Sequence, residues 1–291
     1  MTPRGHGLGV LLIAASAVAY STAGFYVRLI PLDPWTILFW RGLFAGGFMA
    51  ACVLAREGRS ALRAVRAVGW PGLVVMACSG VSSLLFINAL HYAPVAQVMI
   101  ILATLPFVIA GLGRIVFGTR ETRTTLIASA LALLGVALMV GGAGDPRRGS
   151  HLGELLACGA TLLLAVTMLT VQRRRDTLML PAAAAATLLA SLLAAPLASP
   201  LALSSRDLGL LALFGMTQSG LGWLLLTLGT RLVSATESAL IGNLEVPLAA
   251  FWVWLAFAET PQPTTLAGGL LVIAAVLWHI WRQPRLRPDG A

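Results

Sequence analysis

The sequence contains no lysine and few charged residues of any kind. Only 11% of its 291 residues are charged and 58% are apolar, with a mean hydropathy of +0.88. Water-soluble domains carry roughly 25% charged residues, so this composition excludes an ordinary soluble domain. The 20 basic residues are all arginines and give a formal charge of +9. A nucleic-acid-binding protein with this charge would need a polar surface, so the hydropathy also excludes nucleic acid as the partner.

Cysteine is scarce, and the common catalytic motifs are missing. Cys52, Cys78 and Cys158 each lie in an apolar run, where cysteine packs as a small hydrophobic residue. Their spacing fits neither a disulfide framework nor a zinc site. The sequence has no phosphate-binding GxxxxGK[ST] loop, no HExxH and no GxSxG. We therefore expect no cofactor, no metal, no ATP coupling within the chain and no enzymatic activity, although a membrane enzyme or channel stays open as a less favoured alternative.

What the sequence does have is long apolar runs. Ten of them are close to the length of about 20 residues that a helix needs to cross the hydrocarbon core of a membrane. They cover residues 8–27, 34–55, 68–90, 94–113, 124–142, 152–172, 178–198, 207–229, 235–257 and 264–281. The first run is not expected to be a signal peptide, because no soluble domain follows it. The pattern predicts an all-α integral membrane protein with ten transmembrane helices.

The chain contains a weak internal repeat. The segment Leu8 to Leu12 resembles Leu152 to Leu156, and Pro106 aligns with Pro247 at a nearly constant offset. Each repeat has five spans, an odd number, so the second copy must cross the membrane in the opposite direction from the first. The two predicted inverted repeats cover residues 1–145 and residues 150–291.

The arginines indicate the orientation. Fifteen of the 20 lie on the side of the two termini, and Arg28, Arg147, Arg148 and Arg206 lie on the other side. Because cytoplasmic loops are enriched in arginine, we expect both termini in the cytoplasm and a multi-pass location in a bacterial-type inner membrane. Where a loop of one half is rich in arginine, the equivalent loop of the other half has few arginines or none, as an inverted duplication requires.

Two charged residues lie inside predicted spans, where they are costly. An arginine at the centre of a spanning helix costs about 2.5 to 3.5 kcal/mol, so Arg41 needs compensation. Two explanations are open: its side chain extends to the outer interface, or it meets a structural or substrate partner. Glu245 lies near the middle of the ninth span, where a structural hydrogen bond and a proton-coupling role are equally compatible with the sequence.

Two prolines occupy corresponding positions in the two halves. Pro247 collides with the carbonyl of Asn243, and Pro106 does the same to Leu102, so both spans are expected to bend or open. Paired helix breaks in inverted repeats indicate the central site of a transporter. Prolines without any function are also tolerated in membrane helices, which is the alternative.

Further polar residues gather in the third, fourth and eighth spans. Ser79, Ser82 and Phe86 share one helix face, and Asn88, Gln97 and Gln218 would lose hydrogen bonds if they faced lipid. Serines alone are equally explained as small residues that let helices approach closely. The candidate substrate-binding residues are Tyr20, Arg41, Ser79, Ser82, Phe86, Asn88, Tyr92, Gln97, Gln218, Trp223, Asn243 and Glu245, with Pro106 and Pro247 as hinges.

These features together resemble a known family. The residues that carry the resemblance are Trp40-Arg41, Ala89-Leu90-His91-Tyr92-Ala93-Pro94-Val95-Ala96, Leu105-Pro106 and Gly135-Val136. They are similar to the EamA family of the drug/metabolite transporter superfamily, which includes the YddG-type aromatic amino-acid exporters. The resemblance implies a ten-helix bundle with an alternating-access cavity between its halves. The second copy departs from the pattern, because Ala184 stands where the first has Arg41.

The expected lining favours one substrate class. Aromatic and amide side chains with few fixed charges suit a zwitterionic or neutral amphiphilic molecule, whereas a phosphate would call for several basic residues. We expect a secondary active exporter of small metabolites, with amino acids first and drugs, purines or sugar derivatives as the alternative. Its partners are a small-molecule substrate and the lipid bilayer. A monomer is sufficient for such a site; the oligomeric state and the driving force stay open.

Overall fold

The structure is a computed structural model, which describes residues 3–58, 61–93, 95–141, 151–174, 176–177, 179–199, 203–258 and 260–282. Pro94 and the repeat boundary at 142–150 lie outside this range, and so do several of the arginines counted above, namely Arg59, Arg147, Arg148, Arg175, Arg285, Arg287 and the side chain of Arg4. Nearly every described residue is helical, and the described residues contain no strand. The predicted all-α fold is confirmed.

The first half contains five spans, two of them interrupted. Its helices are α1 (Pro3–Ser21), α2 (Ala23–Leu29), α3 (Pro34–Glu57), α4 (Ala61–Tyr92), α5 (Val95–Ala103), α6 (Leu105–Phe117) and α7 (Arg123–Gly141). α1 and α2 form one span, and α5 with α6 forms another that bends by 41°.

The second half repeats this plan. Its helices are α8 (His151–Arg173), α9 (Leu180–Ala194) with a 3-10 turn at Ala195–Leu197, α10 (Ser205–Leu213), a π-helix at Phe214–Leu221, α11 (Gly222–Gly229), α12 (Ala235–Gly242), α13 (Glu245–Phe257) and α14 (Pro263–Arg282). Over the described residues, nine helices are long and apolar enough to cross a membrane, and the bent α5–α6 pair makes ten. The ten predicted runs therefore agree with the structure to within a few residues at most ends.

Helix ends follow local sequence rules. The side chain of Asp33 accepts hydrogen bonds from the backbone amides of Trp35 and Thr36, which fixes the start of α3. Gly118 adopts a left-handed conformation (φ 66°) that ends α6. Gly69, with φ 55°, separates the first turns of α4 from its membrane-spanning part. The connection before the third span is thus partly helical, because α4 begins at Ala61, before the membrane-spanning part.

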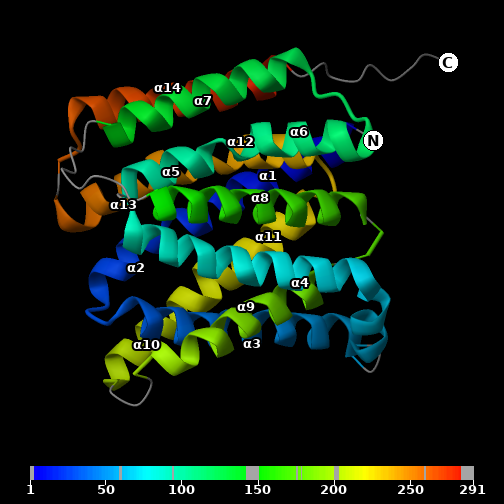
Figure 1. Cartoon of the computed structure of the whole chain (residues 1–291), viewed down its shortest axis with the longest axis vertical. Helices are drawn as coiled ribbons and strands as arrows, with labels where there is room; N and C mark the ends of the chain where they lie inside the picture. Colours follow the sequence, from blue (N-terminus) through cyan, green and yellow to red (C-terminus); the bar gives the residue numbers. More distant parts are fainter. Residues whose placement is uncertain are drawn as a thin grey trace.

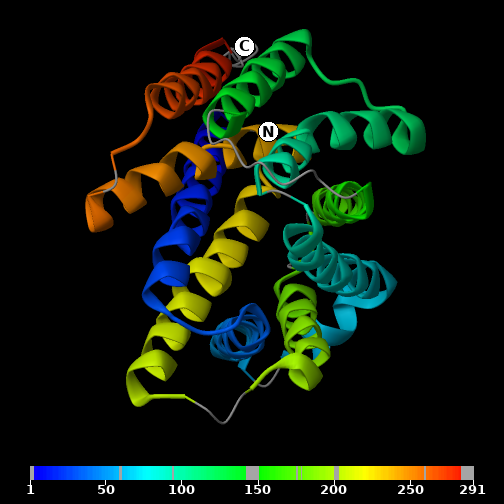
Figure 2. The same ribbon diagram turned by 60° about the vertical axis from the view of Figure 1, so that its left-hand side comes forward.

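Helix packing follows a pseudo-twofold pattern between the halves. The second span packs on the seventh (α3 on α9), and the fifth packs on the tenth (α7 on α14). The contact of α4 with α8 joins the third span of the first repeat to the first span of the second. Its counterpart is the contact of α1 with α11, which joins the first span of the first repeat to the third span of the second. Figures 1 and 2 show α7 and α14 side by side at one edge of the bundle. This arrangement is that of two inverted five-helix repeats.

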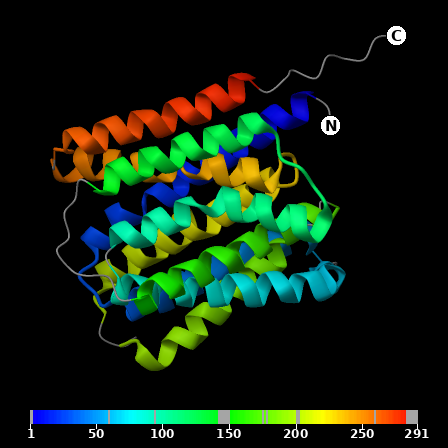
Figure 3. The same cartoon turned by 45° about the horizontal axis from the view of Figure 1, so that its top comes forward.

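The start of α1 and the end of α14 lie at the same end of the bundle (Figure 3). We call this end the termini face and the other end the opposite face. The turns after α6, α8 and α11 belong to the termini face, because each of these spans ends beside the termini (Figure 1).

Candidate functional site

Both proline-containing spans are interrupted at their predicted breaks. In the first half the break is at Thr104, whose hydroxyl donates to the carbonyl of Ile101 at 2.6 Å, and buried Pro106 lies in the first turn of α6. In the second half the break is at Asn243 and Leu244, directly before α13. The carbonyl of Asn243 is not left free, because the amide of Val246 donates to it at 3.2 Å. The predicted helix breaks are present; their role as hinges stays a prediction.

The eighth span contains a π-helix that the sequence did not predict. π-helical turns are rare and occur mostly at functional sites. Two of its glycines let α3 approach closely: a Cβ on Gly215 would lie 2.6 Å from the carbonyl oxygen of Arg41, and one on Gly220 would lie 2.6 Å from the ring of Phe48. The close approach brings Gln218 of the π-helix to the side chain of Arg41.

Arg41 has a partner inside the bundle. Its Nη1 donates to Oε1 of Gln218 at 3.4 Å, and its Cζ lies 5.5 Å from the ring centre of Phe214. Gln218 is 5% exposed and also accepts a hydrogen bond from the hydroxyl of Ser219. Of the two explanations open for Arg41, the structure therefore supports a partner in the protein rather than extension to the interface.

Tyr20 connects Arg41 with Glu245. Its ring packs on Gly222, where a Cβ would lie 3.0 Å from the nearest ring atom, and its hydroxyl group lies within Coulombic range of both charged side chains. Among the described residues, Arg41 and Glu245 form no ion pair with each other, and the Glu245 carboxylate receives no hydrogen bond. An arginine and an acid from different halves thus lie near one tyrosine without forming an ion pair with each other. We call Tyr20, Arg41, Gln218 and Glu245 the central polar set.

The predicted residues of α4 and α5 have other surroundings. The hydroxyl of Ser82 donates to the carbonyl of Ala160 on α8 at 2.8 Å, and Ser79 is buried one turn earlier. Phe86 packs against the buried cluster of α4, α5 and α8. The amide of Asn88 donates to Leu84 of its own helix.

Tyr92 and the two remaining amides complete the predicted residues. Tyr92 is 46% exposed at the end of α4 and lies against His91. The Oε1 of Gln97 and the Nδ2 of Asn243 are buried and have no hydrogen-bond partner among the described residues. Their roles, like those of the α4 residues, stay predictions.

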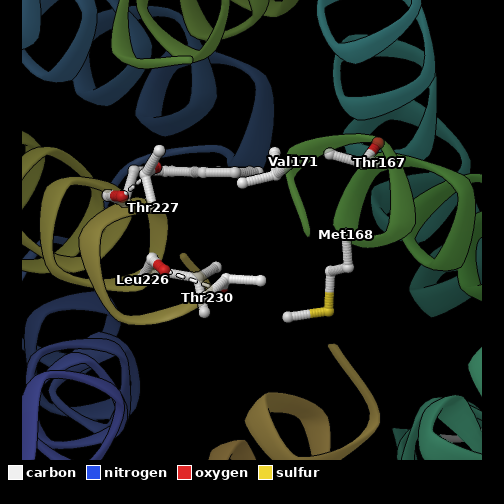
Figure 4. A pocket seen from close by; sticks show the side chains of 7 residues that line it. Thr167, Met168, Val171, Leu226, Thr227 and Thr230 are labelled. Atoms are coloured by element: carbon white, nitrogen blue, oxygen red, sulfur yellow. Dashed lines mark hydrogen bonds between the residues drawn. The ribbon is translucent and has the colours of Figure 1, made fainter. Parts of the chain in front are cut away.

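Trp223 lines a small cavity between α8 and α11, shown in Figure 4. The cavity volume is about 10 Å³, which is room for about one water molecule. The hydroxyls of Thr167, Thr227 and Thr230 donate to carbonyls of their own helices, so the threonines contribute few free polar groups to it. The cavity lies toward the termini face, since Val171 and Thr230 are near the ends of their helices.

Sequence reasoning missed a cluster of three ionisable residues at the termini face. His6 Nε2 lies 3.1 Å from Oε1 and 3.2 Å from Oε2 of Glu237, and His279 Nε2 lies 3.6 Å from the same Oε1. The residues come from α1, α12 and α14. The available indication was that Glu237 and His279 interrupt otherwise apolar runs.

Two arginine–phenylalanine contacts lie at opposite faces. At the termini face, Cζ of Arg173 is 3.7 Å from the ring centre of Phe117, and at the opposite face Cζ of Arg28 is 5.6 Å from that of Phe257. The second phenylalanine follows the first at the offset of the internal repeat. Each contact joins a helix of one repeat to a helix of the other, so the two are related by the pseudo-twofold arrangement.

The sequence pattern of the EamA-like transporter family matches this chain twice, at residues 7–141 and 151–281. The chain belongs to the EamA-like transporter family. Two curated relatives are the pseudopaline exporters CntI of Pseudomonas aeruginosa strains UCBPP-PA14 and PAO1. Each is 27% identical over 278 residues, which is 92% of this chain and 94% of the relative.

A solved crystal structure supports the same fold. It has a TM-score of 0.81 with 15% sequence identity and covers 94% of this chain and 97% of its own chain. As a member of the family with an exporter as relative, the chain is a multi-pass membrane transporter for a small molecule.

Proposed function

We propose that this transporter is a secondary active exporter of small zwitterionic metabolites, with amino acids as the main substrates, and that it works by alternating access between two repeats at residues 1–145 and 150–291. The observation that carries the proposal is the pair of opposite charges, Arg41 and Glu245, held near Tyr20 without an ion pair between them. An inner-membrane location with both termini in the cytoplasm is part of the proposal.

The argument rests on the cost of charge inside a membrane protein. Ionisable residues within spans are retained when they pair with one another or with a substrate. A zwitterion supplies both missing partners, since its carboxylate fits the guanidinium of Arg41 and its ammonium group fits the carboxylate of Glu245. The hydroxyl of Tyr20 interacts electrostatically with both Arg41 and Glu245, so it lies near the groups that would hold the two ends of the zwitterion.

Aromatic side chains surround the Arg41 end of this set. Phe214 stacks on Tyr26 with ring centres 4.9 Å apart, and Trp40 stacks on Phe44 at 5.8 Å. The Nε1 of Trp40 is buried and has no hydrogen-bond partner among the described residues, so it is an available donor. Such surroundings suit an apolar or aromatic substrate side chain and favour aromatic amino acids among the proposed substrates.

Two features support alternating access. The halves are inverted copies, and each face has one of the two equivalent arginine–phenylalanine contacts. The contact at the termini face is the shorter one, and the small cavity toward that face has room for only about one water molecule, which fits a closed termini face. Exchanging the two contacts between faces would open one end while closing the other. Export direction is supported by the exporter among the relatives and by the arginine-rich termini face.

The test is counterflow of radiolabelled amino acids into proteoliposomes. Saturable uptake is expected for the natural protein, with Arg41→Gln and Glu245→Gln each lowering kcat/KM by roughly 30-fold to 4,000-fold, since truncating one partner of a buried charge pair costs about 2 to 5 kcal/mol. Matched controls are Arg206→Gln at an exposed position and Glu154→Gln at a half-exposed one, both close to the ends of their spans and away from the central polar set. They should leave kcat/KM unchanged.

Other results would contradict the proposal in distinct ways. Unchanged kinetics in both central variants would remove the zwitterion site. Saturable flux of drugs, purines or sugar derivatives but of no amino acid would identify the alternative substrate class.

A further inference from the structure

The helix α13 is loosely packed for a helix that begins beside the proposed substrate site. Of its 13 residues, all of which the structure describes, only Pro247 is buried. Its equivalent in the first repeat, α6, has three buried residues and packs on both α8 and α12. α13 begins directly after the Asn243–Leu244 break and ends at the opposite face, and Figure 2 shows it in orange at the edge of the bundle. It is therefore a weakly held helix with a break at its inner end.

Side-chain contacts hold the outer part of α13 on the first span. The Nε1 of Trp252 donates to the hydroxyl oxygen of Ser21 at 2.9 Å. Nearer the opposite face, the ring centre of Phe257 lies 6.0 Å from that of Phe25 and 5.6 Å from Cζ of Arg28. The Trp252–Ser21 contact is the most directional of these, because a hydrogen bond weakens steeply when its geometry changes. A small rotation of α13 would break it.

Ser21 lies where the first span is interrupted. Its side chain is buried, donates to the carbonyl of Val18 at 2.7 Å and accepts from Trp252 at the same time. The hydroxyl of Thr22 donates to the carbonyl of Ala19 at 2.7 Å, and α2 begins directly after it. Hydroxyls that bind carbonyls of the preceding turn bend helices. The two side chains therefore explain a break at a place where the sequence has no proline.

The corresponding contact at the termini face is apolar. Ala165 stands at the position of Ser21 in the second repeat, and α8 is continuous there. Ala165 lies in a buried cluster of α6, α8, α11 and α12 whose members are all apolar. The opposite face is thus held by a hydrogen bond where the termini face is held by apolar packing.

The hydrogen bond adjoins the central polar set on both of its helices. Tyr20 directly precedes Ser21 on α1. Glu245 lies in the first turn of α13, two turns before Trp252, which is about 10 Å along a helix. A rotation of α13 about the Asn243–Leu244 break therefore changes the position of Glu245 and the Trp252–Ser21 distance together.

We propose that α13 is the gate of the opposite face, that it moves about the Asn243–Leu244 break, and that the hydrogen bond from Trp252 to Ser21 is the latch that holds it closed. When the latch breaks, α13 moves away from α1 and α2 and opens a path from the central polar set to the opposite face. Ser21 keeps its bond to Val18, so the open state leaves no unsatisfied hydroxyl there. That the path carries substrate outward rests on the exporter function proposed above.

The latch is tested without substrate by double electron–electron resonance in nanodiscs. The three natural cysteines are replaced by alanine, and spin labels are attached at Val27→Cys and Leu255→Cys, whose side chains are exposed on α2 and α13. A second pair, Ile115→Cys and Arg174→Cys, reports on α6 and the end of α8 at the termini face. The first pair should show a shorter and a longer distance, for the closed and open gate.

Two variants remove the latch from its two sides. Trp252→Phe removes the N–H donor and keeps an aromatic ring, while Ser21→Ala removes the acceptor. Each should raise the ratio of the longer to the shorter Val27–Leu255 distance by about threefold to tenfold, which is the effect of losing one net hydrogen bond. The double variant should give the same ratio as either single variant, because all three lack the same interaction.

The chain offers a matched control for each variant. Trp254→Phe makes the same change on the same helix, at a side chain that is 46% exposed. Ser83→Ala removes a hydroxyl that donates within its own helix, to the carbonyl of Ser79. Both should leave the Val27–Leu255 distances unchanged. The pair at the termini face should not lengthen in any of the variants.

Transport measures the same shift from the two sides of the membrane. With substrate offered at the termini face, Trp252→Phe should raise the apparent KM by up to about tenfold, because fewer molecules are open to that face. With substrate offered at the opposite face, the apparent KM should not rise. A variant that merely damaged the fold would lower kcat from both sides and leave this difference absent.

Each outcome decides one point. Unchanged distances in both latch variants would overturn the latch, and so would an equal shift in Trp254→Phe or a double variant whose effect is the product of the two single effects. An apparent KM that changes equally from both sides would overturn the role of the gate in transport. Absence of any flux in the natural protein would refute the exporter function, while the spin-label distances would still decide whether the latch exists.

Discussion

Many polar side chains inside the bundle form hydrogen bonds with backbone carbonyls of their own helix. Thr161, Thr167 and Thr170 each donate to the carbonyl four residues earlier, as hydroxyls in membrane helices commonly do. Asn88 does the same with its amide. A polar residue in a span is therefore weak support for a site. Arg41 and Glu245 differ, because their own helices give them no such partner, and this makes them the stronger candidates.

Glycines at helix contacts give a stability prediction. A Cβ on Gly268 would lie 2.4 Å from the carbonyl oxygen of Gly135 and 2.7 Å from Met139, so α7 and α14 would have to separate. We expect Gly268→Ala to destabilise the protein by about 1 to 3 kcal/mol, as overpacking of cores does. The unfolding midpoint in a detergent titration measures this.

Gly111→Ala is the matched control for that prediction. Gly111 lies on the exposed side of α6, where an added Cβ meets nothing within 4 Å. It should leave stability unchanged or raise it slightly, since alanine favours helix more than glycine does. Equal midpoints for the two variants would mean that α7 and α14 do not pack as closely as described.

At the scale of elements, interrupted spans distinguish this bundle from a set of straight helices. The breaks at Thr104 and at Asn243–Leu244 were predicted from Pro106 and Pro247, because proline prevents one helix hydrogen bond wherever it occurs. The π-helix at Phe214–Leu221 was not predicted. No proline marks it, and its glycines Gly215 and Gly220 lie where α3 approaches closely, a contact that hydropathy does not show.

The proline breaks lead to a kinetic prediction. Pro106→Ala and Pro247→Ala should let the two spans straighten, and counterflow should fall by about tenfold, which corresponds to about 1.4 kcal/mol in the barrier. Expression and the unfolding midpoint should fall much less than the flux. If protein amount and flux fell in parallel, the prolines would be folding elements rather than moving parts.

At the scale of the whole molecule, the orientation in the membrane is a prediction from the arginines. Alkaline phosphatase fused after Leu32 or Leu203 should be active, because these connections face outward when the termini are cytoplasmic. Fusions after Thr119 or Val233 should be inactive, and a fluorescent protein at the same positions should give the reverse pattern. The opposite result at all four positions would place the arginine-rich face outside and reverse the proposed direction of transport.

The sequence by itself determined the number of spans, the inverted relation of the halves and the two proline breaks. These features are local or additive along the chain: hydropathy, an odd number of spans per repeat and arginine counts need no knowledge of contacts. Membership of the EamA family also followed from short motifs in the sequence, and the match at residues 7–141 and 151–281 confirmed it.

Only the tertiary structure decided which polar side chains meet. Arg41 contacts Gln218 across 177 residues, and His6 contacts Glu237 across 231. Such contacts depend on the rotation of each helix about its axis and on how closely glycines let helices approach. Every face of a membrane helix is largely apolar, so the sequence pattern leaves that rotation undefined, and packing of the ten spans fixes it.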